Sequence, residues 1–101
     1  MTNCCIIITT TDSIEVSNKI SQNLIKKRYA RCVQRDNIES IYEWNGEIVT
    51  SVEYRLMIKS IESKYDLVVE CIKGVHNYEI PEIIKINIDA GSEEYMRWVM
   101  D

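Results

Sequence analysis

The chain is poor in glycine, proline and histidine, with three, one and one of these residues among 101. No glycine-rich phosphate loop, dinucleotide-binding fingerprint or nucleophile elbow occurs, so the enzyme classes that depend on these motifs have no support. The four cysteines form no Cys-x-x-Cys pair, which excludes a zinc knuckle and a thioredoxin-type motif. We therefore predict that the protein is not an enzyme.

Positive charge is also scarce. Twelve Lys and Arg residues stand against 16 Asp and Glu residues, giving a net charge of -4 and an isoelectric point near 5.0. A nucleic-acid footprint needs a basic face, and the only basic run, residues 26–28, suits the solvated last turn of a helix. No apolar run approaches the roughly 20 residues of a membrane span. We predict neither a nucleic-acid partner nor a membrane partner.

Nothing in the sequence indicates export. Residues 1–3 carry no basic side chain, and the apolar run behind them is too short for a secretory signal. Cysteines such as Cys4, Cys5, Cys32 and Cys71 are typically small buried hydrophobes in a reducing compartment. We therefore predict a cytoplasmic protein. Cys4 and Cys5 are adjacent in a predicted strand, so their side chains should point to opposite faces.

Length and a hydrophobic content of 46% predict one compact domain over residues 1–101. The run Cys4–Thr10 is β-branched and apolar, as in a central strand that is buried on both faces. Asp12 and Ser13 can cap a helix, and apolar residues at helical spacing predict that this helix continues to about Arg28.

A long β-hairpin is predicted in the middle of the chain. Strand residues Ala30–Val33 lead into a polar stretch, residues 34–37, where we expect a bulge, and the strand resumes over Ile38–Trp44. Asn45-Gly46 is a strong signal for a type I′ turn. The third strand then runs from Glu47 to about Lys59, which is longer than the usual range of roughly 3–10 residues.

The turn predicts the register of this hairpin. A two-residue turn places Tyr42 opposite Val49 and Ile41 opposite Thr50, with Trp44 beside the turn. Apolar side chains then lie on both faces near the tip, and a domain of this size cannot cover such a ribbon. We interpret the tip as a subunit interface that includes Ile41, Trp44 and Val49.

The second half repeats the helix-then-strand order. Ser60 is predicted to cap a helix that ends before Gly74, a natural residue for the position after a helix. Residues 76–82 are predicted to form a loop, alternating isoleucines over residues 84–88 indicate a fourth strand, and Ser92 can cap a short last helix. The order βαββαβ plus a terminal helix indicates an α+β fold of the ferredoxin-like sandwich type.

The predicted loop at residues 76–82 holds the only histidine and the only proline of the chain. Loops on a rigid scaffold are frequent binding sites. His76 is our candidate metal ligand, with Glu82 or Glu79 completing a mixed site, because imidazole binds copper and zinc well. Cys71 would favour Cu(I) as a thiolate. In the structural alternative, His76 hydrogen-bonds the backbone at the helix exit and Cys71 lies on the buried face.

Together these segments resemble the CutA family of divalent-cation tolerance proteins over nearly the whole chain. The resemblance rests on Cys32-Val33, Ser40-Ile41-Tyr42-Glu43-Trp44-Asn45-Gly46, Glu53, Lys59, Glu70-Cys71-Ile72-Lys73, His76-Asn77-Tyr78-Glu79-Ile80-Pro81-Glu82-Ile83, Tyr95 and Trp98. The order and spacing of these pieces, rather than any one of them, make the match specific.

The resemblance implies a ferredoxin-like protomer in a tight homotrimer that is joined by its long strands, with Trp98 added to the interface residues named above. It also implies a role in the response to metal ions, with copper or another divalent cation as the ligand. Two positions depart from the family pattern. Thr9 stands where some bacterial members carry a cysteine that is a suspected metal ligand, and Asp36-Asn37 stands in place of Pro-Gly.

CutA trimers resemble those of the PII signalling proteins, which bind small ligands in clefts between subunits. A second reading is therefore a small-ligand module with Tyr42, Glu53, Lys59 and Tyr78 along an intersubunit cleft. Glu53 and Lys59 are about 20 Å apart on one strand face, so they cannot pair within a subunit. Interface hydrogen bonds among these residues are the structural alternative. A trimeric scaffold for other proteins is a third reading.

Overall fold

The computed structural model describes residues 2–101 as a four-stranded antiparallel sheet with the strand order β2-β3-β1-β4. This is the ferredoxin-like order, and it confirms the predicted α+β fold. Within this range no helix is long and apolar enough to cross a membrane. The elements are β1 (Cys4–Thr11), α1 (Ile14–Lys26), β2 (Cys32–Trp44), β3 (Glu47–Ile61), the 3₁₀ turn η1 (Glu62–Lys64), α2 (Tyr65–Val75), β4 (Ile83–Asn87) and α3 (Glu93–Met100).

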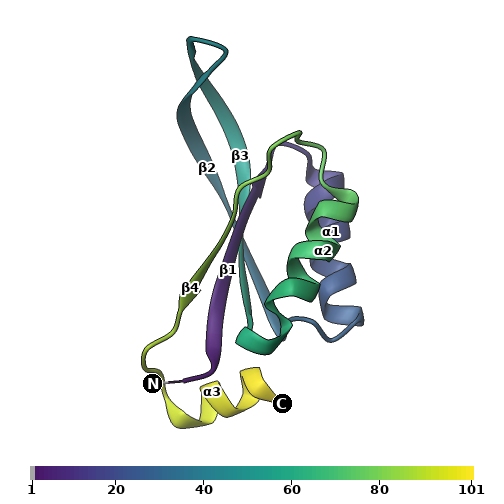
Figure 1. The fold of residues 1–101 in the computed structure, drawn as a ribbon, viewed down its shortest axis with the longest axis vertical. Helices are drawn as coiled ribbons and strands as arrows, with labels where there is room; N and C mark the ends of the chain where they lie inside the picture. Colours follow the sequence, from purple (N-terminus) through teal and green to yellow (C-terminus); the bar gives the residue numbers. More distant parts are fainter. Residues whose placement is uncertain (1) are drawn as a thin grey trace.

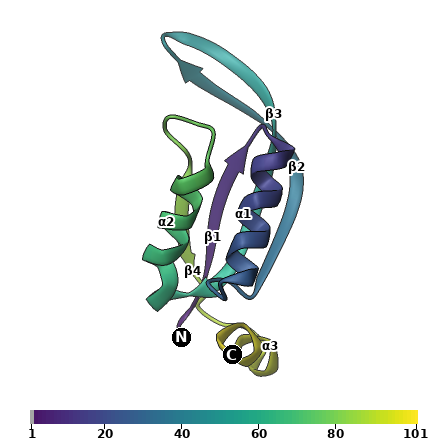
Figure 2. The same ribbon diagram turned by 90° about the vertical axis from the view of Figure 1, so that its right-hand side faces the viewer.

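Helices α1 and α2 lie side by side on one face of the sheet, which forms the main core (Figure 2). Ile20 and Leu24 of α1 and Ile72 of α2 pack there with Ile7 of β1 and Leu56 of β3, and all five are fully buried. Burial of each such side chain contributes about 1.5–3 kcal/mol relative to exposure. This core holds the sheet and the two helices together as one body.

Helix α3 makes a second, smaller core at the end of the sheet away from the hairpin tip (Figure 1). Met96 and Val99 of α3 pack against Cys4, whereas Cys5 belongs to the main core. The two adjacent cysteines therefore lie on opposite faces of β1, as the alternation of side chains along a strand predicts.

Side-chain and backbone caps determine where α1 begins and ends. The hydroxyl of Ser13 accepts a hydrogen bond from the N–H of Val16 at 3.2 Å, which satisfies one free donor of the first turn. After the helix, Arg28 adopts a left-handed backbone with φ 62°. The N–H of Tyr29 then donates to the carbonyl of Leu24 at 2.9 Å and closes the helix end.

Strands β2 and β3 form one uninterrupted ladder that ends at the pair Trp44–Glu47. Asn45 and Gly46 have φ values of 52° and 80°, and these positive values are what a type I′ turn requires. The cross-strand pairs expected near the tip are confirmed.

The expected bulge at residues 34–37 is wrong. Asp36 stays in the ladder opposite Arg55, and its carboxylate accepts two hydrogen bonds from that guanidinium, at 2.8 and 3.2 Å. A polar stretch can remain in register because cross-strand partners and solvent satisfy its side chains without an extra residue in the strand.

The tip of the hairpin projects beyond the helices (Figure 1). Val52 and Ile48 share a face of β3 with the core residue Leu56, because side chains alternate along a strand. Their side chains are nevertheless 68% and 84% exposed. The chain therefore leaves the tip of its long hairpin uncovered.

A second apolar surface, which is partly exposed, lies on the sheet face opposite α1 and α2, where α3 covers one end. Ile6 and Ile8 of β1 pair with Ile86 and Ile84 of β4, and directly paired residues share a face. Neighbouring Ile7 belongs to the main core, so these four side chains point the other way. We call Ile6, Ile8, Ile84 and Ile86 the isoleucine face.

The boundaries of α2 differ from those predicted. Ser60 is not a cap, because it lies within β3, is 2% exposed and donates its hydroxyl to the carbonyl of Tyr29. Helix α2 begins only at Tyr65, and Gly74 lies inside it. Pairing with β1 extends β3 past the local cap signal, since ladder hydrogen bonds outweigh a single side-chain cap. Ser92 precedes α3 as expected but makes no capping hydrogen bond through its side chain.

Replacing Arg28 with glycine should raise the free energy of unfolding, by up to about 1 kcal/mol, because glycine adopts this left-handed backbone without the steric cost of a Cβ. Urea denaturation at one protein concentration measures the change. Lys27→Gly is the matched control: Lys27 has a helical φ of -80°, so its replacement should destabilise the protein. A less stable Arg28→Gly protein would contradict the prediction.

Candidate functional site

His76 anchors the loop between α2 and β4 through both nitrogens of its ring. Nδ1 accepts a hydrogen bond from the backbone N–H of Tyr78 at 3.0 Å, so this nitrogen carries no proton. Nε2 bears the proton of the neutral ring and donates to the carbonyl oxygen of Thr10 at 2.8 Å. The imidazole therefore hydrogen-bonds the backbone at the helix exit, which is the structural alternative considered from the sequence.

Asn77 ties the same loop to the end of β1. Its Oδ1 accepts a hydrogen bond from the hydroxyl of Thr11 at 2.6 Å, and its Nδ2 donates to the carboxylate of Asp12 at 2.8 Å. Thr11 is fully buried, so the loop is attached to a rigid part of the sheet. The residues that follow Asn77 are thereby presented from a fixed base.

Tyr78 closes the loop onto the hairpin. Its hydroxyl donates to Oε2 of Glu53 at 2.6 Å, and Glu53 is only 5% exposed. Burial of the phenol, reinforced by the hydrogen bond and the negative charge of Glu53, raises the pKa of Tyr78 well above its ordinary range. Tyr78 thus remains a protonated hydrogen-bond donor at physiological pH and does not act as a base.

Between the loop and the hairpin lies an open cleft of about 650 Å³, which we call the hairpin–loop cleft. Glu53, Glu79 and Glu82 line it, and none of its lining residues is basic, so its potential favours cations. The volume falls in the range of roughly 300–1,000 Å³ that is typical of small-molecule sites. The remaining lining residues are Thr10, Ser40, Ile41, Tyr42, Trp44, Asn77, Tyr78 and Ile80.

The cleft brings together most of the residues singled out from the sequence, from all three predicted sets: Ile41, Tyr42, Trp44, Glu53, Tyr78, Glu79 and Glu82. Val49 pairs with Tyr42 across the hairpin. His76 lies behind the cleft as the anchor of its loop and does not line it.

Two predicted residues lie elsewhere. Lys59 donates from Nζ to the hydroxyl of Tyr95 at 3.0 Å, beside α3 rather than beside Glu53. The ring of Trp98 lies 4.6 Å from the guanidinium of Arg31. Both therefore belong to the α3 end of the molecule, remote from the hairpin–loop cleft.

Four lining residues were not predicted as site residues: Thr10, Ser40, Asn77 and Ile80. Asn77 and Ile80 belong to the loop already singled out, so their position in it was the available signal. Thr10 and Ser40 are ordinary strand residues in the sequence. Only the pairing of the strands in the folded sheet brings them to the wall of the hairpin–loop cleft.

The side chains around the cleft that can act as metal ligands are few and are mainly carboxylates. Within residues 2–101, no group of three or more His, Cys, Asp or Glu side chains is arranged to hold a metal ion. Glu79 and Glu82 offer carboxylate oxygens, whereas a metal on His76 must replace one of the two ring hydrogen bonds. Cys71 packs against the main core, and burial raises the pKa of its thiol. Around the cleft, Glu79 and Glu82 are therefore the side chains whose free oxygens suit a divalent cation.

The family model that describes the CutA1 divalent ion tolerance protein matches residues 5–101. The chain belongs to this family. It is 33% identical over 97 residues to the divalent-cation tolerance protein CutA of Thermus thermophilus, covering 95% of this chain and 94% of that protein. It is 38% identical over 87 residues to the CutA homolog of Xenopus laevis, covering 85% of this chain but only 58% of that protein. The chain thus spans little more than half the length of the frog relative.

Solved structures agree with this assignment. The periplasmic divalent cation tolerance protein CutA from Archaeoglobus fulgidus superimposes with a TM-score of 0.92 at 30% identity, over 95% of this chain and 94% of that one. The divalent cation tolerance protein of Thermus thermophilus superimposes with a TM-score of 0.91 at 33% identity, over 96% of this chain and 95% of that one. The CutA fold therefore extends over almost all of the described residues.

Replacing Tyr78 with phenylalanine should lower the free energy of unfolding by about 2 kcal/mol, because the buried carboxylate of Glu53 loses its hydrogen-bond donor. Tyr42→Phe removes a hydroxyl from the same cleft without breaking the Tyr78–Glu53 bond, and its effect should stay within about 0.5 kcal/mol. Urea denaturation at a fixed protein concentration measures both. Equal effects of the two substitutions would contradict the role assigned to Tyr78.

The same hydrogen bond predicts a pH dependence. The pKa of Tyr78 is raised in the folded protein, so its contribution to stability is complete below the unfolded-state pKa of about 10 and is lost as the pH rises above it. The stability difference between the wild-type protein and Tyr78→Phe should therefore shrink at alkaline pH. A difference that stays constant across this window would argue against the raised pKa.

Proposed function

We propose that the protein binds divalent cations, copper or another metal, as part of the cellular response to metal ions, and that it does so as a homotrimer without enzymatic activity. The observation that supports this is the gathering of Glu53, Glu79 and Glu82 around one cleft in a member of the CutA1 family. Carboxylate oxygens are the usual ligands of hard divalent ions, and copper(II) also accepts oxygen donors.

Within this proposal Glu79 and Glu82 are the primary ligands. Glu53 is already engaged by Tyr78, which leaves one of its two oxygens available. His76 remains a candidate ligand only if metal binding compensates for the hydrogen bond that the ring gives up. Because one protomer supplies few donors, a neighbouring subunit is the natural source of the others.

The compartment is also part of the proposal. All four cysteines are free, which suits the reducing cytoplasm. The names of relatives point to other compartments for those proteins: one from Arabidopsis thaliana is called chloroplastic, and the one from Archaeoglobus fulgidus is called periplasmic.

Replacing Glu79 and Glu82 together with glutamine should weaken the affinity for copper(II) by about a hundredfold or more, because each lost charge-assisted contact is worth roughly 1.5–3 kcal/mol. Titration of metal-free protein against a competing chelator measures the affinity. Glu70→Gln on the exposed side of α2 is the control and should bind like the wild-type protein. Unchanged affinity in the double variant would refute the carboxylate site.

His76→Ala belongs in the same titration. A loss of copper affinity in a variant that keeps its native mass would assign the imidazole as a ligand. Unchanged affinity would leave His76 as a structural anchor and the carboxylates as the site.

The trimer is supported by the apolar surfaces that the protomer leaves open. Ile41, Trp44 and Trp98, the proposed interface residues together with Val49, have exposures of 68%, 45% and 41%. The isoleucine face adds further apolar area on the same sheet. Soluble monomers rarely expose contiguous apolar patches of this kind, and burial between subunits would remove them from water.

Replacing Ile41 with glutamate should shift the protein from trimer to monomer, because a charge at the hairpin cannot be buried unpaired in an interface. Leu67→Glu, at a partly exposed apolar position on α2, is the matched control and should remain trimeric. Native mass spectrometry measures the number of subunits in both variants. A wild-type protein of monomeric mass would refute the trimer itself.

A second candidate function is favoured by the size of the cleft. A volume of about 650 Å³ with Ile41, Tyr42, Trp44 and Ile80 on its walls is larger than an ion needs and suits a small organic ligand, as in the PII-like reading. Such a ligand would raise the melting temperature of the metal-free protein, since binding to the native state stabilises it. Stabilisation that needs a metal ion would favour the first proposal.

A further inference from the structure

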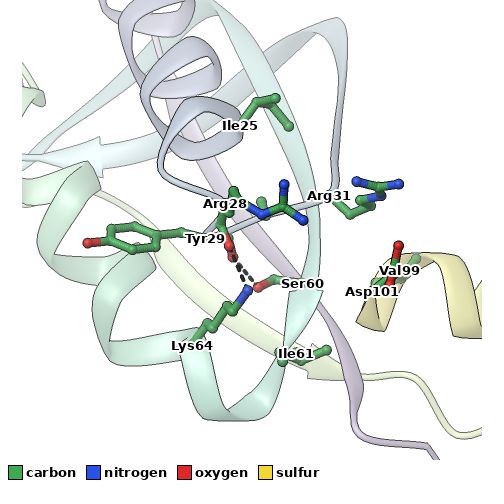
Figure 3. Close-up of a pocket in the computed structure, with 10 residues that line it drawn as sticks. Ile25, Arg28, Tyr29, Arg31, Ser60, Ile61, Lys64, Val99 and Asp101 are labelled. Atoms are coloured by element: carbon green, nitrogen blue, oxygen red, sulfur yellow. Dashed lines mark hydrogen bonds between the residues drawn. The ribbon is translucent and has the colours of Figure 1, made fainter.

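A small basic pocket lies at the α3 end of the molecule, opposite the hairpin tip. It has a volume of about 210 Å³ and forms where the turn after α1, the end of β3, η1 and α3 meet (Figure 3). It shares no lining residue with the hairpin–loop cleft. The two cavities are therefore separate, and a ligand in this pocket would be independent of the proposed cation site.

Three cations gather at this pocket. Arg28, Arg31 and Lys64 line it, and Asp101 is its only acidic lining residue. None of the three cations has a carboxylate within ion-pair distance among residues 2–101, where the ion pairs all involve other basic residues. Such a concentration of positive charge is unexpected in a chain of net charge -4. An anion would relieve the mutual repulsion of the three groups.

The protein itself leaves hydrogen-bonding capacity unused here. Nε of Arg31 is buried and has no partner within residues 2–101, while stacking on Trp98 holds its guanidinium in place. Lys64 donates to the carbonyl of Arg28 at 2.6 Å and keeps two further N–H donors. Buried or partly buried donors without acceptors destabilise a fold until a ligand or water supplies them.

Arg28 occupies a position that favours glycine. Its φ of 62° is left-handed, and its backbone is held by the Lys64 contact and by a hydrogen bond from its N–H to the carbonyl of Ile25 at 3.1 Å. Figure 3 shows its guanidinium extending over the pocket on the side of Arg31. Binding sites often hold a residue in an unfavourable backbone conformation because that conformation places its charged side chain.

We propose that this pocket binds a small oxyanion of the phosphate type, either free phosphate or the terminal phosphoryl group of an ester. Guanidinium groups make paired, charge-assisted hydrogen bonds to phosphate oxygens, and the ammonium group of Lys64 adds a point charge. The volume lies below the roughly 300 Å³ at which drug-sized sites begin, so the pocket accommodates the anionic group and not a whole nucleotide.

The test is a titration of the 101-residue chain, in its native assembly, with sodium phosphate at constant ionic strength, followed by ¹H–¹⁵N NMR. Saturable shifts should appear in the turn at Arg28–Arg31 and around Lys64. Sodium chloride in place of phosphate should give no saturable shift. Equal responses to chloride and phosphate, or no response to either, would overturn the proposal.

Arg28→Gly should weaken phosphate binding about tenfold, through the loss of one charge-assisted contact. Glycine suits the left-handed backbone, so loss of binding cannot be attributed to unfolding. Lys64→Gln should also weaken binding. Lys73→Gln is the matched control, because it removes one positive charge from the last turn of α2, away from the pocket. Its affinity for phosphate should stay within about twofold of that of the wild type. If Lys73→Gln weakened phosphate binding as much as Lys64→Gln, the affinity would come from the overall charge of the protein, and the site would be refuted.

A parallel titration with glycerol phosphate distinguishes the two sources of the anion. Binding of both compounds with the same sensitivity to Arg28→Gly would identify a phosphoryl group as the ligand. Binding of inorganic phosphate alone would identify free phosphate.

Discussion

Positive φ values at Asn45 and Gly46 close the β2–β3 ladder in one register, and the site depends on that register. Side chains alternate between the faces of a strand, so a slip by one residue would exchange the two faces. In the observed register Leu56 faces the helices and Glu53 faces the loop that carries Tyr78. The same turn therefore places both the core side chains and the cleft side chains of β3.

The loop between α2 and β4 shows how polar side chains divide their roles. His76, Asn77 and Tyr78 are engaged in hydrogen bonds that fasten the loop to β1 and to the hairpin. Glu79 and Glu82 follow them and line the cleft. Anchoring the first three residues gives the two carboxylates a defined position, which a binding site needs and a free loop lacks. The single imidazole of the sequence, that of His76, thus holds the loop in place and does not line the cleft.

Prediction from the sequence succeeded where a local signal and the tertiary fold agree. Asn45-Gly46 predicted both the turn and the pairs beside it, and the alternation of side chains along a strand predicted that Cys4 and Cys5 lie on opposite faces. It was wrong where a local signal competed with pairing. Ser60 has the chemistry of a helix cap, but the ladder with β1 keeps it in β3. The polar residues around Asp36 suggest a bulge, but the cross-strand partner Arg55 keeps them in register.

The sequence by itself determined the order of the elements, the α+β class, the position of the turn and the loop in which the polar residues cluster. These properties follow from interactions between residues that are close in the chain. Hydrophobic periodicity and turn-forming residues are therefore enough to predict them. The tertiary structure alone decided that Tyr78 meets Glu53, that Lys59 is directed to Tyr95 instead, and that Arg28 and Lys64 share a pocket. Those contacts join residues 25 to 36 positions apart. They arise only when the sheet register and helix packing have fixed the distances between segments.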